Sequence, residues 1–129
     1  MRARLFVRTI VVLSLASRAF CQDSSSFRGN PQHTGVYNTV GVAKFSKVKW
    51  KFHTGGQVIS SPAVNGGTVY VGSTDGILHA IDRESGVQRW QFDAKSRVVS
   101  SPAISNGMVY FTAYDGNLYA LDSESGQLK

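Results

Sequence analysis

Cysteine and long apolar runs are the scarcest features of this chain. Cys21 is the only cysteine among 129 residues, so a cut after it would leave no thiol in the rest of the chain. Arg8 and Arg18 confine the first apolar stretch to far fewer than the roughly 18 residues that a membrane-spanning helix needs. The sequence therefore gives no case for a disulfide-stabilised fold and predicts no transmembrane segment.

A strong excess of charge is also missing once the charges are placed along the chain. The formal net charge is +6, but four arginines lie in the first 21 residues and all eight acidic residues follow them. Residues 22–129 then carry ten basic and eight acidic side chains, a net charge of +2. A nearly balanced chain offers no electrostatic basis for binding nucleic acid, so nucleic acid is not a predicted partner.

The first 21 residues have the pattern of a secretory signal peptide. Three arginines among the first eight residues precede a short apolar stretch over 9–16, and Ala19 and Cys21 place small residues where signal peptidase reads. This pattern predicts cleavage before Gln22 and export to the periplasm or the outside of the cell. A lipid-modified Cys21 is the alternative, and Arg18 and Phe20 argue against it.

An internal repeat occupies the last 80 residues. Residues 50–89 and 90–129 align over 40 positions, of which 18 are identical. A period of about 40 to 45 residues that is rich in short strands and turn residues is typical of a β-propeller blade. The repeat therefore predicts an all-β propeller of four-stranded antiparallel blades.

Turn residues divide each unit into predicted strands. In the first unit Asn65-Gly66-Gly67, Asp75-Gly76 and Ser85-Gly86 mark the turns between strands over 58–64, 68–73, 77–81 and 87–92. The second unit predicts strands over 98–104, 108–113 and 117–121, without a fourth. Residues 22–46 have no sustained period and are interpreted as an irregular lead-in before the repeats of residues 47–129.

Residues 48–52 alternate apolar and basic side chains, which predicts a half-buried strand. By the phase of the repeat this is the fourth strand of a blade, and in a closed ring its partners would come from the C-terminal end. A ring needs about four to eight blades, or roughly 160 to 320 residues, whereas two blades are present. We therefore expect the N-terminal piece of a larger, eight-bladed ring, with two packed sheets and open edges.

The sequence over 80–90 has the form A-x-D-x-x-[TS]-G-x-x-x-W, and 120–126 repeats it up to the tryptophan. This form resembles the tryptophan-docking motif of PQQ-like (quinoprotein-type) repeat proteins. The Val-x-Ser-Ser-Pro-Ala of each unit and the lead-in over 27–35 also resemble secreted bacterial members of that family. The resemblance implies a structural docking motif at Ala80, Asp82, Ser85, Gly86, Trp90, Ala120, Asp122, Ser125 and Gly126.

The motif also has a physical basis. An indole offers a large apolar area but its N–H needs an acceptor, and Ala80 on the neighbouring strand leaves room for the ring. Asp82 and Ser85 can accept hydrogen bonds from backbone N–H groups in the turn. We therefore expect Trp90 to be buried against Ala80, across the third and fourth strands of its own blade.

Other polar residues are predicted to be structural. Asp75 and Asp115 each precede glycine and indicate hairpin turns rather than metal ligands, and the serine pairs 60–61 and 100–101 recur in both units, which a nucleophile would not need. No spacing among His33, His53 and His79 resembles a metal motif. Three positions at which the two units differ are candidates for a ligand-binding site, namely Gln57/Arg97, Thr74/Tyr114 and Ile77/Asn117.

The resemblance leaves three functions open. The first is a non-catalytic exported propeller that binds other proteins or serves as a scaffold, as in outer-membrane assembly, with protein partners or the rest of its own propeller. The second is the N-terminal part of a PQQ-dependent alcohol or sugar dehydrogenase, and the third is the sensor domain of a larger signalling protein. No cofactor ligand is predicted in this segment, so PQQ and calcium would require ligands from other blades.

Overall fold

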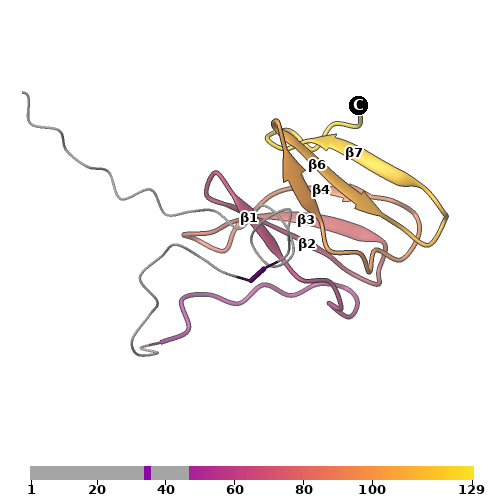
Figure 1. The fold of residues 1–129 in the computed structure, drawn as a ribbon. Coiled ribbons are helices and arrows are strands. Elements are labelled where there is room, and N and C mark those ends of the chain that lie inside the picture. The colour runs from indigo at the N-terminus through magenta and orange to yellow at the C-terminus, as the bar shows by residue number, and fades with distance from the viewer. Residues whose placement is uncertain (1–33, 36–46) are drawn as a thin grey trace, which may run out of the picture.

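The computed structural model describes residues 34–35 and 47–129. These residues form two antiparallel sheets (Figure 1). The first has the order β1-β2-β3-β4, with β1 (Ala63–Asn65), β2 (Thr68–Gly72), β3 (Ile77–Asp82) and β4 (Gln88–Asp93). The second has the order β5-β6-β7, with β5 (Ala103–Ser105), β6 (Met108–Thr112) and β7 (Leu118–Asp122). The predicted signal peptide, and all of the lead-in except 34–35, lie outside the described residues.

The first hairpin of each sheet is a two-residue turn, as predicted. Asn65 pairs with Thr68, and the intervening Gly66 and Gly67 have φ values of +54° and +78°. Positive φ at both central residues matches the twist of the flanking strands. In the second sheet Asn106 and Gly107 take these positions with φ of +50° and +73°.

The first strand of each sheet is shorter than predicted: residues 58–62 and 98–102 form no strand. The Ser60 hydroxyl donates to the Gly72 carbonyl and accepts from the Gly72 N–H, both at 3.0 Å. The side chain thus replaces the backbone ladder at this point, and Pro62 has no N–H to resume it. Ser100 makes the same two bonds to Thr112, at 2.8 and 2.9 Å.

Residues 48–52 pair with no strand in the described part of the chain, in agreement with the expectation that their partner strands are not among these two units. A strand needs a partner for its backbone hydrogen bonds. The segment instead lies against the first sheet through side chains: Lys49 pairs with Glu84, and the Phe52 ring meets His79 edge-on at 5.2 Å. Within residues 34–35 and 47–129 the second sheet has no fourth strand, as predicted, and an isolated bridge links Leu121 and Leu128.

The core lies between the two sheets. Phe92 on β4 packs edge-on against Phe111 at 6.1 Å between ring centroids, and against Tyr119 at 5.4 Å. The backbone N–H of Ser61 donates to the hydroxyl of Ser101 across the junction at 3.0 Å. Both sheets contribute to one buried apolar cluster, which includes Leu78, Ala80, Val98, Val109, Phe111 and Leu121.

Equivalent residues of the two units differ sharply in burial. Leu78 has 0% of its surface exposed, whereas Leu118, one period later, is 70% exposed. Val98 is 0% exposed and its counterpart Val58 is 50% exposed. The junction thus buries the side of the first sheet that faces the second, and the start of the second unit.

We expect Leu78→Ala to lower the free energy of unfolding by about 2 to 5 kcal/mol, because it removes a fully buried side chain and leaves a cavity. Leu118→Ala is the matched control and should change it by no more than about 0.5 kcal/mol. Urea unfolding followed by fluorescence measures both. Equal losses for the two variants would contradict the packing described here.

Candidate functional site

Trp90 connects the two sheets. Its Nε1–H donates to the carbonyl of Ser123 at 3.1 Å, in the turn that follows β7. The indole lies against Gly126, where an added Cβ would stand only 2.7 Å from Cδ2 of the ring. Trp90 is paired with Ala80 as expected, and its ring centroid lies 5.7 Å from that of Tyr70 on β2 of the same sheet. The side chain is half-buried and also reaches the second sheet. The prediction missed the contact with the second sheet, whose turn supplies the acceptor for the ring N–H.

Trp50 makes the same contact one period earlier. Its Nε1–H donates to the carbonyl of Arg83 at 2.8 Å, and a Cβ on Gly86 would lie 2.6 Å from Cγ of the indole. Each tryptophan therefore docks on the turn of the sheet that follows it. The sequence carried a signal for this partner, since the interval from Trp50 to Gly86 equals that from Trp90 to Gly126.

The docking turns are held by an aspartate. Asp82 Oδ1 accepts from the backbone N–H of Glu84 at 3.0 Å and from both the N–H and the hydroxyl of Ser85 at 2.8 and 2.9 Å. Asp122 repeats these bonds with Glu124 and Ser125, at 3.1, 2.9 and 2.9 Å. The last turn residue is glycine with φ of +73° or +72°, a conformation that side-chain-bearing residues rarely adopt.

Hydrogen bonding lowers the pKa of both aspartates. For Asp82 the Arg89 guanidinium is the main cause, followed by the N–H and hydroxyl of Ser85, and together they hold the pKa well below its ordinary value. For Asp122 the main cause is the backbone N–H of Ser125. Both carboxylates are thus ionised and committed to their turns.

The two alanines of the predicted motif occupy different environments. Ala80 has 0% exposure and lies opposite Trp90 in the β3–β4 ladder. Ala120 is half-buried, and its carbonyl accepts from the N–H of Lys129 at 3.0 Å. The nine predicted residues therefore divide into two docking sites, one around Gly86 and one around Gly126, and the tryptophan of the first site is Trp50.

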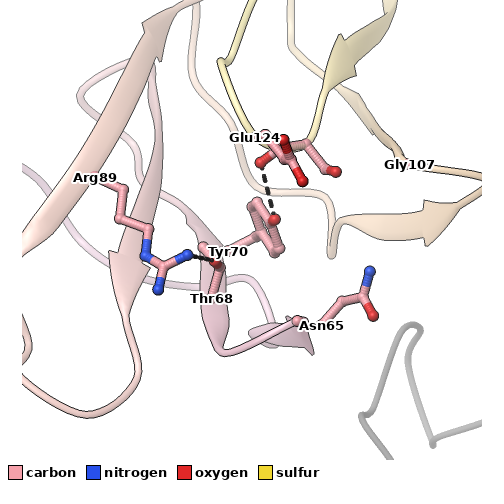
Figure 2. Close-up of a pocket in the computed structure, with 8 residues that line it drawn as sticks. Asn65, Thr68, Tyr70, Arg89, Gly107 and Glu124 are labelled. Carbon is pink, nitrogen blue, oxygen red and sulfur yellow. Dashed lines mark hydrogen bonds between the residues drawn. The ribbon is translucent and has the colours of Figure 1, made fainter.

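An open cleft of about 470 Å³ lies between the sheets on the side of these turns, and sequence reasoning did not predict it (Figure 2). The Tyr70 hydroxyl donates to the Ser123 carbonyl across it at 3.0 Å, and burial raises the pKa of this phenol. The Arg89 guanidinium donates to Thr68 at 2.9 Å and to Asp82 at 2.5 Å. The lining residues are Asn65, Gly66, Thr68, Tyr70, Arg89, Gly107, Ser123 and Glu124.

The opposite end of the sheets holds the positions where the repeat differs. In the first unit Gln57 N–H donates to the Thr74 hydroxyl at 2.8 Å, and Thr74 N–H donates to the Gln57 carbonyl at 3.0 Å. In the second unit Tyr114 N–H donates to the Arg97 carbonyl at 3.1 Å. The Arg97 guanidinium carbon lies 5.4 Å from the centre of the Tyr114 ring, within range of a cation–π interaction. Both side chains of this second pair are exposed.

Asp75 and Asp115 hold hairpin turns at this end. Asp75 accepts from the N–H groups of Ile77 at 3.1 Å and Gly55 at 2.8 Å. Asp115 accepts from the backbone and side-chain nitrogens of Asn117 at 3.0 and 2.8 Å, and from the Tyr119 hydroxyl at 2.5 Å. These bonds lower the pKa of Asp115, that from Tyr119 most, and the same bond raises the pKa of Tyr119.

The donor set does not fit calcium in the part of the chain that the structure describes. No three side chains of histidine, cysteine, aspartate or glutamate gather there, whereas calcium takes six to eight oxygen ligands. Among the histidines, His79 is buried, with Nδ1 at 3.0 Å from Gln88 Oε1, His53 is exposed, and His33 lies outside the described residues. Across residues 34–35 and 47–129 there is no helix capable of crossing a membrane.

Two sequential antiparallel sheets, related by a 40-residue repeat and packed face against face, define neighbouring blades of a β-propeller. The chain belongs to the family of outer membrane protein assembly factor BamB, whose model matches residues 40–129. The prediction of PQQ-like propeller repeats is thereby confirmed. No curated protein sequence shows significant similarity to the chain.

Solved structures share the fold. Quinohemoprotein alcohol dehydrogenase from Comamonas testosteroni is 26% identical with a TM-score of 0.68, over 83% of this chain and 18% of that one. BamB from Moraxella catarrhalis is 23% identical with a TM-score of 0.58, over 64% of this chain and 25% of that one. A europium-containing methanol dehydrogenase is 16% identical with a TM-score of 0.57, over 64% and 18%. The chain thus spans a quarter or less of each of these proteins.

The two glycines Gly126 and Gly107 allow a matched test of tryptophan docking. Their φ values are +72° and +73°, but a Cβ on Gly107 would meet nothing within 4 Å. Gly107→Ala should cost only the backbone strain, about 1 to 2 kcal/mol, and Gly126→Ala about 1 to 3 kcal/mol more because the indole must move. Urea unfolding compares the two variants, and equal losses would show that the indole does not rest on Gly126.

The pKa of Asp82 makes stability depend on pH. A carboxyl whose pKa is lowered by folding stabilises the protein above its unfolded pKa and loses that contribution as pH falls through the folded value. We expect the Tm to fall between about pH 5 and pH 2, Asp82→Asn to flatten this part of the profile, and Arg89→Gln to move it to higher pH. Thermal unfolding across this range is the measurement. Profiles that coincide with the unmodified chain in both variants would contradict the assignment.

Proposed function

We propose that this chain is part of a non-catalytic, exported propeller that binds other proteins or serves as a scaffold in outer-membrane protein assembly. The match of residues 40–129 to the BamB family supports this role. Trp50 and Trp90 act as docking residues that hold successive blades together. Residues 1–21 act as a signal peptide, so that the exported chain begins at Gln22 without a lipid on Cys21.

The observation that carries the binding role is the exposed Arg97–Tyr114 pair. Tyr114 is 67% exposed, and its ring is held by Arg97 at 5.4 Å. Tyrosine and arginine are enriched at the energetic centres of protein interfaces. Their counterparts Gln57 and Thr74 share the same backbone bond, but they place a glutamine and a threonine there, and the Thr74 hydroxyl accepts from the Gln57 N–H. The exposed pair of aromatic and cationic side chains is therefore particular to the second blade.

A PQQ-dependent dehydrogenase is the competing function, since two of the structural neighbours are dehydrogenases. The carboxylates that calcium would need are used elsewhere in this segment. Asp82 and Asp122 hold the docking turns, and Asp115 is bonded to Asn117 and Tyr119. We therefore assign no cofactor to these blades.

The experiment replaces Tyr114 with a photoreactive phenylalanine analogue in bacterial cells that express and export the chain. The matched control carries it at Ser105, which is also exposed and ends β5 opposite Met108, the first residue of β6. We expect the Tyr114 probe to crosslink a protein of the outer-membrane assembly machinery, identified by mass spectrometry, and Arg97→Ala to weaken the adduct. The mass of the exported chain from the same cells reports whether it begins at Gln22.

Two results would contradict the proposal. Equal crosslinking from Tyr114 and Ser105 would remove the case for a binding surface at this end. Saturable, stoichiometric binding of PQQ with calcium, followed by quinone absorbance, would favour the dehydrogenase.

A further inference from the structure

The first sheet buries a histidine that uses only one of its two ring nitrogens. His79 on β3 is 4% exposed. Its Nδ1 lies 3.0 Å from Oε1 of Gln88, and the amide nitrogen of Gln88 donates to Oε1 of Gln91 at 3.1 Å. Because Oε1 of Gln88 can only accept, Nδ1 carries the proton of the neutral ring. Nε2 is then an acceptor, and it has no hydrogen-bond partner among the residues that the structure describes.

The carboxylate of Asp75 lies in front of this nitrogen. Its Oδ2 is 4.0 Å from Nε2 of His79 and accepts from the N–H of Gly55 at 2.8 Å. Gly55 belongs to residues 47–57, which we call the leading segment and which lie against the first sheet without pairing as a strand in the described part of the chain. Oδ2 and an unprotonated Nε2 are both acceptors, so no hydrogen bond can join them while the ring is neutral.

The second unit shows what a donor does at the same place. Tyr119 stands one period after His79, and its hydroxyl donates to Oδ2 of Asp115 at 2.5 Å. The same oxygen also accepts from the side-chain nitrogen of Asn117 at 2.8 Å. A ring donor at this position therefore reaches the turn aspartate, and the carboxylate oxygen accepts two bonds at once. A donor on His79 could likewise bond to Asp75 without displacing Gly55.

The surroundings of His79 leave Asp75 as its charged neighbour. Phe52 of the leading segment meets the histidine ring edge-on at 5.2 Å. In the described part of the chain, the other ionisable groups on the elements packed around His79 are exposed or bonded elsewhere. The exposed ones are Lys47, Lys51 and His53, and the bonded ones are Lys49 to Glu84, Tyr70 to Ser123, Asp82 to Arg89, and Asp93 to Lys95.

We propose that His79 is a proton-dependent latch for the leading segment. A proton on Nε2 turns this nitrogen into a charged donor, and a movement of about 1 Å brings it to hydrogen-bond distance from Oδ2 of Asp75. The buried charge then has a partner of opposite sign. The new bond fixes the carboxylate that holds Gly55, so the leading segment is held more tightly.

The direction of the pH dependence follows from where this bond exists. It forms in the folded, protonated chain and is absent from the unfolded chain, so its contribution is present at low pH and is lost as pH rises. Histidine changes charge between about pH 5 and pH 8, which places the latch in that range. Tyr119 makes the corresponding bond in the second unit without an added proton.

Hydrogen–deuterium exchange of the full-length protein tests the latch. Mass spectrometry follows a peptide over residues 53–57 at about pH 5.5 and about pH 7.5, and each exchange rate is divided by the rate of the unstructured peptide at that pH. We expect roughly tenfold more protection at the lower pH, as one charge-assisted hydrogen bond gives. His79→Tyr should give high protection at both pH values, and His79→Leu low protection at both.

The matched control is His53→Gln, because His53 is an exposed histidine of the same segment. This variant should keep the full pH difference. The proposal is overturned if the unmodified protein shows equal protection at the two pH values, a measurement that needs no variant to fold. It is also overturned if the pH difference survives in His79→Leu or disappears in His53→Gln.

Discussion

The contact on which the rest of this structure depends is the indole of one unit resting on the glycine turn of the next. An indole contributes a large apolar area, but burying it is favourable only if its N–H keeps a hydrogen bond. The carbonyls of Arg83 and Ser123 supply that bond, and Gly86 and Gly126 leave the space that any side chain would fill. The tryptophan therefore joins its own sheet, where the Trp90 ring packs near Tyr70, to the turn of the following sheet.

The remaining junction contacts run in the same direction along the chain. The Val98 side chain packs against Gly72, the Tyr70 hydroxyl donates to the Ser123 carbonyl, and the Ser61 N–H donates to the Ser101 hydroxyl. Each contact joins one unit to the next, so the stability of a unit depends on its neighbour, as in other repeat architectures. This is why Leu78 and Leu118, identical residues at equivalent positions, differ so much in exposure.

Similarity between the repeats does not make their surfaces equivalent. In the cleft beside the docking turns the charge of Arg89 is satisfied by Asp82, which makes that end of the junction structural. At the opposite end the second unit exposes Arg97 and Tyr114, where the first unit has Gln57 and Thr74. The two units therefore differ most in their exposed side chains at this end.

The sequence by itself determined the repeat, the hairpins and the Asp-x-x-Ser-Gly turns, because glycine at positive φ and short aspartate hydrogen bonds act within a few residues. Tertiary structure decided the rest. The first strands are short because serine hydroxyls replace ladder bonds to residues 12 positions away, and residues 48–52 form no strand without a partner sheet. Trp90 docks on Gly126 as well as on its own sheet, because its N–H bond depends on which carbonyl lies within reach. Local patterns cannot specify that carbonyl, since it belongs to the next unit and only packing brings it there.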